Sequence, residues 1–388
     1  MKVGIVAENY FPTLGGIQEH IRHLRNFLVD RKVEVTILTG NPSVNGTVPG
    51  PKDANNCVVR VGKARSYGTG GTTTQATAGP RVWWNMHKAI RAGKFDLLNI
   101  HGPGDFGLPF FGLTQFAGPK VLTLHSCFPD AKWRHRVSPY YRWAFGRASA
   151  VIAVSEATRN SMQRYANFHA NIVPNGVDVR YWEQGRPTAR YKAPGIRNIV
   201  YVGRLEDRNG PDILIDALPE ILRAAPNVRL LIAGDGPRRA ALEARILPAL
   251  RDRVLFLGAV YDERPDILAS STLFLLPARA VGFSIMVLEA FAAGLPVVAL
   301  PSLGTNQAGK HWDNVLLSAD DSVGAYARAV TDALAQNQDS RIAKGRVVAS
   351  AFDWSEVGPS ILDVFQSVLR PAIQSSNKPQ SHQLAAVF

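Results

Sequence analysis

The chain contains very little cysteine. Cys57 and Cys127 are the only two among 388 residues. So low a content fits a reducing compartment and argues against a metal–thiolate site. The sequence also contains no Asp-x-Asp pair that would typically hold a metal beside a phosphate. We therefore expect no metal ligands and no obligatory metal cofactor.

Long apolar runs are also missing. No stretch approaches the roughly 20 apolar residues that a membrane-spanning helix requires. The start shows no secretory pattern, because Lys2 is followed by only five apolar residues, Val3–Ala7, before Glu8. These absences predict a cytoplasmic protein, and the length is sufficient for two domains that each have a core.

Acidic residues are scarce in the first half of the chain. Residues 1–175 contain 21 Lys and Arg but only 9 Asp and Glu, whereas residues 176–388 contain 23 and 22. Nearly all of the net charge of +13 therefore lies in the first half. This excess indicates an anionic partner there, such as a lipid surface, a phosphorylated substrate or nucleic acid. A basic surface kept for solubility is the alternative.

The chain begins with a strand–helix–strand pattern. Lys2–Ala7 and Val33–Leu38 read as buried parallel strands, and Ile17–Asp30 as an amphipathic helix between them. Gly15 and Gly16 precede the helix, so the turn allows either a ligand to approach or a tight bend of the backbone. The composition of residues 41–80 predicts a long loop with one strand near Val58–Val61.

Polar residues follow several of the next predicted strands. His101 follows Leu97–Ile100, His125 follows Lys120–Leu124, and Ser155 follows the apolar run that ends at Val154. In a parallel sheet the carboxyl ends of the strands form one edge, where ligands bind. The three residues are therefore candidates for a site, with a purely structural hydrogen-bonding role as the alternative.

Lys132–Arg147 interleaves five basic and five aromatic residues. This combination suits an anionic membrane interface, and it also suits stacking on sugars or nucleic acid. A core-facing aromatic stripe with a solvated basic back is equally consistent with the pattern.

The strand pattern restarts after a polar stretch at Tyr181–Pro194. Strands are predicted at Asn198–Val202, Arg229–Ile232 and Val254–Leu257, and a helix over Pro211–Ala224. Two consecutive α/β units in one chain predict two doubly wound parallel sheets.

Leu273–Leu300 reads as strand, loop, helix, turn and strand. Ser284 stands where a helix cap is expected, and Gly294 where the helix ends. Glu289 is the only charged residue between Ala280 and Gly309, and it shares a helix face with apolar neighbours. A carboxylate in that position must either pair with an arginine from elsewhere, reach solvent, or bind a ligand.

Taken together, these segments resemble the family 4 glycosyltransferases (glycosyltransferase group 1), retaining enzymes of the GT-B fold that use nucleotide sugars. The resemblance covers about residues 1–371 and depends on the order and spacing of its parts. The matching segments are Gly15-Gly16-Ile17, His125-Ser126, Val154-Ser155-Glu156, Pro174–Asp178, Val202–Leu205, Ala233–Pro237, Phe256-Leu257-Gly258, Gly282–Ala290, Ala293–Val298 and Phe352-Asp353-Trp354.

The resemblance implies two Rossmann-like domains on either side of a cleft. We expect an acceptor-binding domain over residues 1–180, a linker over 181–194 and a nucleotide-sugar-binding domain over 195–353. A helix over 354–371 is expected to cross back to the first domain, and residues 372–388 to be a disordered tail.

The resemblance also implies roles for individual residues. Glu289 would hold the ribose hydroxyls, and Arg204, with Arg208 near it, would neutralise the diphosphate. His125 and Arg204 are the predicted catalytic residues. The predicted donor-binding residues are Gly15, Gly16, Ser155, Arg204, Arg208, Gly234, Leu257, Phe283, Ser284, Ile285 and Glu289.

Three positions depart from the family pattern. Val281 stands where the family has the first of two glutamates, Asn209 stands where it has a lysine, and Leu303-Gly304 replaces a Gly-Gly pair. The resemblance nevertheless implies a retaining glycosyltransferase that uses a UDP- or GDP-sugar, and the basic first half of the chain suggests an anionic or membrane-associated glycan or lipid-linked acceptor. We expect an anionic membrane surface, and not nucleic acid, to be its further partner. The alternative is a degenerate homologue that binds nucleotide or a partner protein without catalysis.

Overall fold

The computed structural model describes residues 1–42, 57–69, 72–102, 107–128, 130–279, 284–301 and 314–370. The prediction of a disordered tail therefore concerns residues outside the described part of the chain.

The first domain is built on a seven-stranded parallel sheet with the order β3-β2-β1-β6-β7-β8-β9. Every strand that the sequence predicts in this half is present. The strands are β1 (Lys2–Val6), β2 (Glu34–Asn41), β3 (Val58–Lys63), β6 (Leu97–His101), β7 (Lys120–Leu124), β8 (Ala150–Ala153) and β9 (Asn171–Ile172).

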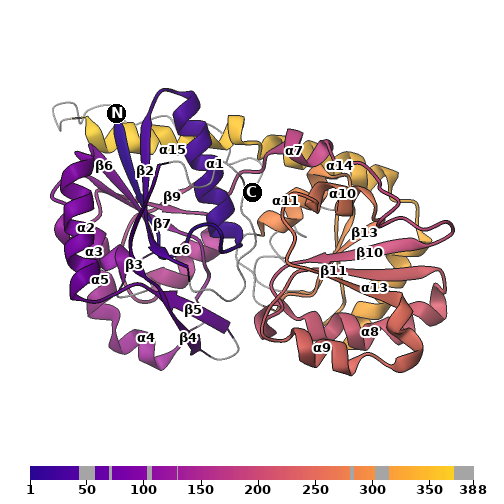
Figure 1. The fold of residues 1–388 in the computed structure, drawn as a ribbon. Coiled ribbons are helices and arrows are strands. Elements are labelled where there is room, and N and C mark those ends of the chain that lie inside the picture. Colours follow the sequence, from indigo (N-terminus) through magenta and orange to yellow (C-terminus); the bar gives the residue numbers. More distant parts are fainter. Residues whose placement is uncertain are drawn as a thin grey trace.

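Helices cover both faces of this sheet, because its strands are apolar on both sides. In β1, Val3 and Ile5 pack with α1 in one hydrophobic cluster, whereas Val6 packs with α2 and α3 in another. Figure 1 shows α1 on one side of the sheet and α2 and α3 on the other. The helices are α1 (Gly16–Asp30), α2 (Pro80–Gly93), α3 (Leu108–Gln115), α4 (Lys132–Arg136), α5 (Ser138–Gly146) and α6 (Glu156–Gln163).

A short hairpin stands apart from the main sheet. β4 (Arg65–Thr69) and β5 (Thr72–Ala76) pair with each other in an antiparallel register. The prediction of a loop with a single strand over residues 41–80 is wrong here. The Gly- and Thr-rich composition indicates turns, and strands that pair only with each other need no apolar face toward the core.

The second domain contains a six-stranded parallel sheet with the order β12-β11-β10-β13-β14-β15. Its strands are β10 (Arg197–Val202), β11 (Val228–Ala233), β12 (Val254–Gly258), β13 (Leu273–Leu276), β14 (Val297–Ala299) and β15 (Val315–Leu317). Its helices are α8 (Pro211–Ala224), α9 (Arg239–Arg245), α10 (Arg264–Ala269), α11 (Ile285–Ala292), α13 (Val323–Ala335) and α14 (Asp339–Ala351), with 3-10 turns η1 (Asp207–Asn209) and η2 (Pro248–Arg253).

Both sheets change direction beside their first strand. β1 lies between β2 and β6, and β10 lies between β11 and β13. Ligands of doubly wound sheets bind outside the carboxyl ends of the strands at such a switch point. The two turns that leave these strands contain Gly15-Gly16 and Gly203-Arg204, so the topology places the predicted donor-site turns at the two switch points.

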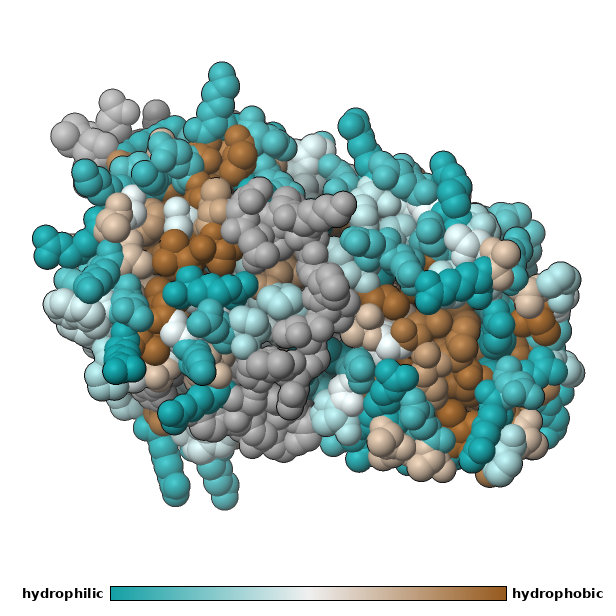
Figure 2. All heavy atoms as spheres, in the orientation of Figure 1, coloured by the Kyte–Doolittle hydropathy of each residue, from teal (hydrophilic) through white to brown (hydrophobic). Residues whose placement is uncertain are grey.

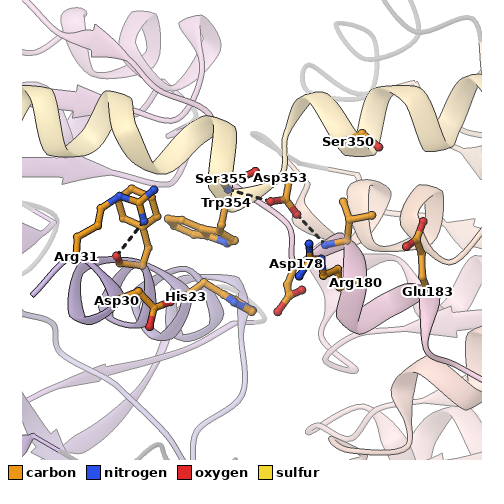
Figure 3. A pocket seen from close by; sticks show the side chains of 12 residues that line it. His23, Asp30, Arg31, Asp178, Arg180, Glu183, Ser350, Asp353, Trp354 and Ser355 are labelled. Carbon is orange, nitrogen blue, oxygen red and sulfur yellow. Dashed lines mark hydrogen bonds between the residues drawn. The ribbon is translucent and has the colours of Figure 1, made fainter.

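Two connections join the domains and are hydrogen-bonded to each other. After β9 the chain passes α7 (Val179–Glu183) into the second domain, and α15 (Trp354–Leu369) returns from α14 to pack against α1. Val177 pairs with Asp353 where the two connections cross. The Asp353 carboxylate accepts from the backbone N–H groups of Ser355 at 2.9 Å and Val179 at 3.1 Å, as Figure 3 shows.

One hydrophobic cluster continues from the first domain into the second. It includes Val3 and Ile5 of β1, Phe365 of α15, and Val200 and Phe274 of the second sheet. On the face drawn in Figure 2, hydrophobic side chains appear in patches on both domains, surrounded by hydrophilic ones. No helix within the described ranges is long and apolar enough to cross a membrane.

The docking of α15 on α1 depends on a glycine, and this leads to a stability prediction. A Cβ atom at Gly358 would lie 2.3 Å from the ring of Phe27, which is buried. We expect Gly358→Ala to lower the free energy of unfolding by about 1–3 kcal/mol, because the ring must move within a packed core. Urea denaturation measures the change.

Gly324→Ala in α13 is the matched control. There the nearest atom to the new methyl group is the flexible end of Arg328, at 3.4 Å. The control should be neutral or up to about 1 kcal/mol stabilising, as expected for Gly→Ala in a helix. Equal stability of the two variants would contradict the proposed packing role.

Candidate active site

The Gly15-Gly16 turn of the first domain lies against the start of α11 in the second. A Cβ atom at Gly16 would lie 3.5 Å from Cδ1 of Ile285. Two predicted donor-site segments that are far apart in the sequence are therefore adjacent. Ser284 is the residue before α11, as predicted, but its side chain makes no capping hydrogen bond, so the predicted cap is wrong in that detail.

Glu289 of α11 is buried, with 4% of its surface exposed. Burial raises the pKa of its carboxyl group from the ordinary value of 4.5 to about 7, and the positive charge of Arg264 opposes this rise. Its Oε2 atom has no hydrogen-bond partner among the described residues. Glu289 therefore has an arginine nearby, and it also has an oxygen available to a ligand.

Arg264 is already bound to a carboxylate of the other domain. Its Nη2 atom lies 2.6 Å from Oε1 of Glu19 in α1, and both side chains are buried. The hydroxyl of Tyr261 donates to Oε2 of the same glutamate at 3.1 Å, and the Arg264 guanidinium lies 4.5 Å from the centre of the Tyr261 ring. Nothing in the local sequence pattern around Glu19 or Arg264 predicts this tie, because it joins two domains.

Arg204 and Arg208 meet on one buried carboxylate. Glu206 is fully buried, and its oxygens lie 2.7 Å from Nη2 of Arg204 and 3.3 Å from Nε of Arg208. The two guanidinium groups, which are predicted to neutralise a diphosphate, are therefore held together and remain partly exposed. Asn209 donates its side-chain N–H to the backbone oxygen of Arg204 at 2.8 Å and adds no charge.

Gly234 is explained by packing within the second domain. A Cβ atom at this position would lie 1.8 Å from the backbone oxygen of Gly203, so only glycine lets the turns after β10 and β11 approach. Leu257, in the neighbouring strand β12, is half-buried and packs against the core. Both residues lie at the carboxyl edge of the second sheet, where they were predicted.

Ser155 already has a structural partner. It precedes α6, and its Oγ accepts a hydrogen bond from the backbone N–H of Thr158 at 3.1 Å. The hydroxyl is buried and also lies 3.0 Å from Oγ1 of Thr158. Its predicted role at the donor site stays a prediction.

Three histidines meet at the carboxyl edge of the first sheet. His101 ends β6 and His125 follows β7, and Nδ1 of the first lies 2.8 Å from Nε2 of the second. The ring of His20, from α1, lies 4.7 Å from that of His125 and 5.7 Å from that of His101, measured between centroids. Burial lowers the pKa of all three imidazoles, that of His125 to about 4, so they are neutral at pH 7.

The sequence identifies His101 and His125 as candidates but not His20. A usable signal is present, because His20 lies three residues after Ile17 and four before Leu24, on the apolar face of α1. A histidine on that face must be buried against the sheet.

Several predictions concern residues that the structure does not describe. Phe283, a predicted donor contact, lies outside the described residues, and so do the departures at Val281 and Leu303-Gly304.

A separate pocket of about 640 Å³ lies between α1, α7 and the start of α15. Figure 3 shows charged side chains of both signs around it, among them Arg31, Asp178 and Asp353. None of the predicted site residues lines this pocket, so it belongs to the hinge rather than to the candidate site.

Comparisons with known protein families agree with the predicted resemblance. Residues 14–181 match the model described as Glycosyltransferase Family 4, and residues 196–336 match the model described as Glycosyl transferases group 1. The first match covers the first sheet except β1, and the second covers the whole of the second sheet.

Relatives match over most of their length. The chain is 29% identical over 387 residues to the phosphatidyl-myo-inositol mannosyltransferase of Mycolicibacterium smegmatis, and the alignment covers 95% of this chain and 94% of that protein. It is 28% identical over 351 residues to a phosphatidylinositol N-acetylglucosaminyltransferase component of Arabidopsis thaliana, covering 85% and 74%. Because relatives of nearly full coverage are named as enzymes, the non-catalytic alternative is not favoured.

Among solved structures, Anabaena HepE in complex with UDP-glucose superimposes with a TM-score of 0.74 at 19% identity, covering 95% of this chain and 100% of that one. This likeness concerns the fold, and the predicted GT-B architecture is confirmed.

The raised pKa of Glu289 leads to a prediction about stability. In the folded state this carboxyl holds its proton up to about pH 7, and in the unfolded state only up to its ordinary 4.5. It therefore favours folding below pH 4.5, and this contribution is lost as the pH rises toward 7 and beyond. Glu289→Gln should remove the dependence and be more stable than the wild type at pH 8, by up to about 3 kcal/mol.

Urea denaturation at pH 5 and pH 8 tests this, with Glu356→Gln as the control for losing an exposed carboxylate. The control should show the same pH dependence as the wild type. If wild type and Glu289→Gln differ by the same amount at both pH values, Glu289 is not titrating in this range.

Proposed function

Because the chain belongs to glycosyltransferase family 4 and is therefore a glycosyltransferase, we propose that it transfers a hexose from a UDP- or GDP-sugar to phosphatidylinositol or a closely related anionic lipid. Mannose is the first choice for the sugar, and retention of configuration is part of the proposal. The observation that carries the proposal is the match to phosphatidylinositol glycosyltransferases over nearly the whole chain.

The acceptor has better support than the sugar. The two relatives described above are named for different sugars, but both names refer to phosphatidylinositol. A basic first domain supports the same acceptor class, since residues 1–175 carry a net charge of +12 of the total of +13. An anionic lipid headgroup is attracted by such a domain, whereas a neutral glycan is not.

On the donor side, we assign Arg204 and Arg208 to the diphosphate. Negative charge grows on the departing nucleoside diphosphate as the glycosidic bond breaks, so two fixed guanidinium groups lower the barrier. Glu206 forms an ion pair with each of them through its two oxygens, which keeps the two positive charges close together before the substrate arrives. With this charge in place, the proposed reaction requires no metal at the diphosphate.

Glu289 suits the ribose of the nucleotide. An ionised carboxylate can accept hydrogen bonds from both hydroxyls of a vicinal diol. Gly16 and Ile285 lie beside each other at the junction of the two domains, and we assign them to the phosphate and sugar end of the donor. We assign His125, at the edge of the first sheet, to the reacting end of the acceptor.

The first domain also exposes three tryptophans, Trp83, Trp84 and Trp133, which are 42–54% exposed. Lys88 lies over the ring of Trp84 and Arg134 over that of Trp133. Exposed tryptophan beside basic residues supports peripheral binding to an anionic membrane.

The basic–aromatic stretch at Lys132–Arg147 is part surface and part core, so the membrane-interface and the core-facing interpretations each apply to one of its helices. α4 buries no residue and exposes Trp133, whereas α5 buries Tyr141 and Phe145. The surface interpretation therefore applies to α4 and the core interpretation to α5.

Product analysis tests the function directly. Purified protein is incubated with phosphatidylinositol in mixed micelles and with GDP-mannose, UDP-glucose or UDP-N-acetylglucosamine, and lipids are analysed by mass spectrometry. We expect a hexosyl-phosphatidylinositol with GDP-mannose. Arg204→Ala should lower kcat by about 100-fold or more, as expected for a lost donor at developing charge, with an unchanged melting temperature.

Arg223→Ala, which removes an exposed arginine from the end of α8, is the control and should retain full activity. Transfer to a neutral glucan but not to phosphatidylinositol would overturn the acceptor. Equal activity of Arg204→Ala and the control would reject the assignment of Arg204 to the diphosphate.

Membrane binding is tested by vesicle sedimentation. The double variant Trp83→Ala/Trp84→Ala should bind vesicles of phosphatidylinositol and phosphatidylcholine at least tenfold more weakly than the wild type, because two interfacial aromatic rings are lost. Binding of the wild type should fall with added salt.

Val347→Ala removes an exposed apolar side chain from α14 in the second domain and serves as the control. Its binding should match that of the wild type. Equal loss in both variants, or wild-type binding that ignores the anionic lipid, would contradict docking through α2.

A further inference from the structure

We propose that His20, His101 and His125 form a binding site for a divalent transition metal of the zinc class. Among the described residues these three histidines are the group whose ligand atoms could hold a metal ion, and the atoms all lie within 4.8 Å of one another. The site goes beyond the proposed transfer reaction, which requires no metal at the diphosphate.

The three rings come from elements that hold them firmly. His20 projects from the second turn of α1, His101 ends a central strand, and His125 directly follows the neighbouring strand. His101 pairs with Thr123 in the sheet, so the positions of the two strand ends are fixed by backbone hydrogen bonds. Three ligands on rigid elements are the arrangement that a preformed metal site requires.

The spacing suits a metal after a small adjustment. Zinc binds histidine nitrogen at about 2.0–2.1 Å, so two nitrogens of a tetrahedral site lie about 3.3 Å apart. Nδ1 of His101 and Nε2 of His125 lie 2.8 Å apart. For this pair, a shift of a few tenths of an ångström would admit an ion in place of the shared proton. The ligand atoms of all three histidines lie within 4.8 Å of one another, so the ring of His20 would have to rotate further to complete the site.

The described residues do not fully satisfy the hydrogen bonding of several ring nitrogens in the cluster. Both ring nitrogens of His20 and Nε2 of His101 are buried without a well-aligned hydrogen bond to any described residue. Buried polar groups are normally hydrogen-bonded, so each unpaired one calls for an unseen partner. The amide of Asn175 lies close enough to raise the pKa of His20 and His125, but its Oδ1 is also without a well-aligned bond.

The chemistry of the donors selects the class of ion. Imidazole nitrogen suits zinc, copper, nickel and cobalt, whereas magnesium and calcium require oxygen ligands. Three protein nitrogens leave a fourth position for water or substrate, as in catalytic rather than structural zinc sites. His125 is the most exposed of the three, so the ion would enter and exchange its fourth ligand on that side.

The surroundings would hold the ligands in place. The ring of Trp354 lies 5.2 Å from that of His20, between centroids, on the return connection of the chain. Asn175 lies close enough to two of the rings to raise their pKa values. Neighbours that orient ligating histidines commonly change metal affinity by 10- to 100-fold when they are removed.

Direct titration tests the site. Untagged full-length protein is freed of metal by chelation and titrated with Zn²⁺ by calorimetry in the absence of any substrate. We expect one ion per chain with a dissociation constant in the micromolar range or below. Co²⁺ should give the visible absorption of a tetrahedral complex, which a loosely bound surface ion does not give.

Variants locate the ion. His20→Gln and His101→Gln should each weaken Zn²⁺ binding at least tenfold, and His169→Gln, at an exposed position outside the cluster, should bind as the wild type does. Circular dichroism confirms that each variant is folded, and either cluster variant suffices if the other unfolds. Absence of stoichiometric binding to the wild type, or equal affinity in all three variants, would overturn the proposal.

The two proposals fail separately. Metal binding is measured without donor or acceptor, so its outcome does not depend on the proposed transfer reaction. If both proposals hold, Zn²⁺ should inhibit transfer by the wild type, because His125 cannot bind the ion and the acceptor together. Inhibition of His20→Gln should require a Zn²⁺ concentration at least tenfold higher.

Discussion

A single buried guanidinium connects the two domains and sets the charge of the candidate donor site. Arg264 binds Glu19 of the first domain and lies close enough to Glu289 of the second to lower its pKa. Arg264 therefore faces two buried carboxylates, and one of them, Glu19, also lies 3.8 Å from the guanidinium of Arg22. Because a buried carboxylate without a full partner is strongly destabilised, Glu289 keeps its proton to about pH 7. The packing of α1 against α10 and the ionisation of Glu289 in α11 therefore depend on the same set of charges.

This coupling gives domain movement a chemical consequence. Any motion that takes Glu19 away from Arg264 leaves Glu289 as the nearby carboxylate of that guanidinium, and the pKa of Glu289 must then fall. The ionised carboxylate is the form that accepts hydrogen bonds from a diol. The two connections between the domains are held to each other where Val177 pairs with Asp353. The pocket of about 640 Å³ lies beside this crossing.

The sequence is sufficient to predict every strand of the two main sheets except β15, because each predicted strand is a short apolar run between turn residues and is recognised locally. The three-residue strand β15 was not predicted. Glu289 could be singled out because no other charge lies near it in the sequence. The pair of Arg264 with Glu19 could not be predicted, since these two residues become neighbours only when the domains meet. The spacing of His20 from Ile17 and Leu24 does predict a buried position. The local sequence does not show, however, that His20 will face the strand ends that carry His101 and His125.

A glycine-containing motif does not by itself identify a ligand site. Gly234 is required by the backbone oxygen of Gly203, and Gly16 allows Ile285 to approach, so both glycines are accounted for by the packing of the chain itself. Their presence indicates a close approach of backbone without identifying a ligand. The charged and imidazole groups differ, because packing alone leaves them unfavourable. They are Glu289 with its raised pKa, the pair of arginines on fully buried Glu206, and His20, whose ring nitrogens have no well-aligned hydrogen bond to any described residue. Groups that a fold keeps at a loss of stability are the ones for which a ligand is the better explanation, and they all lie at the carboxyl edges of the two sheets or at the junction between the domains.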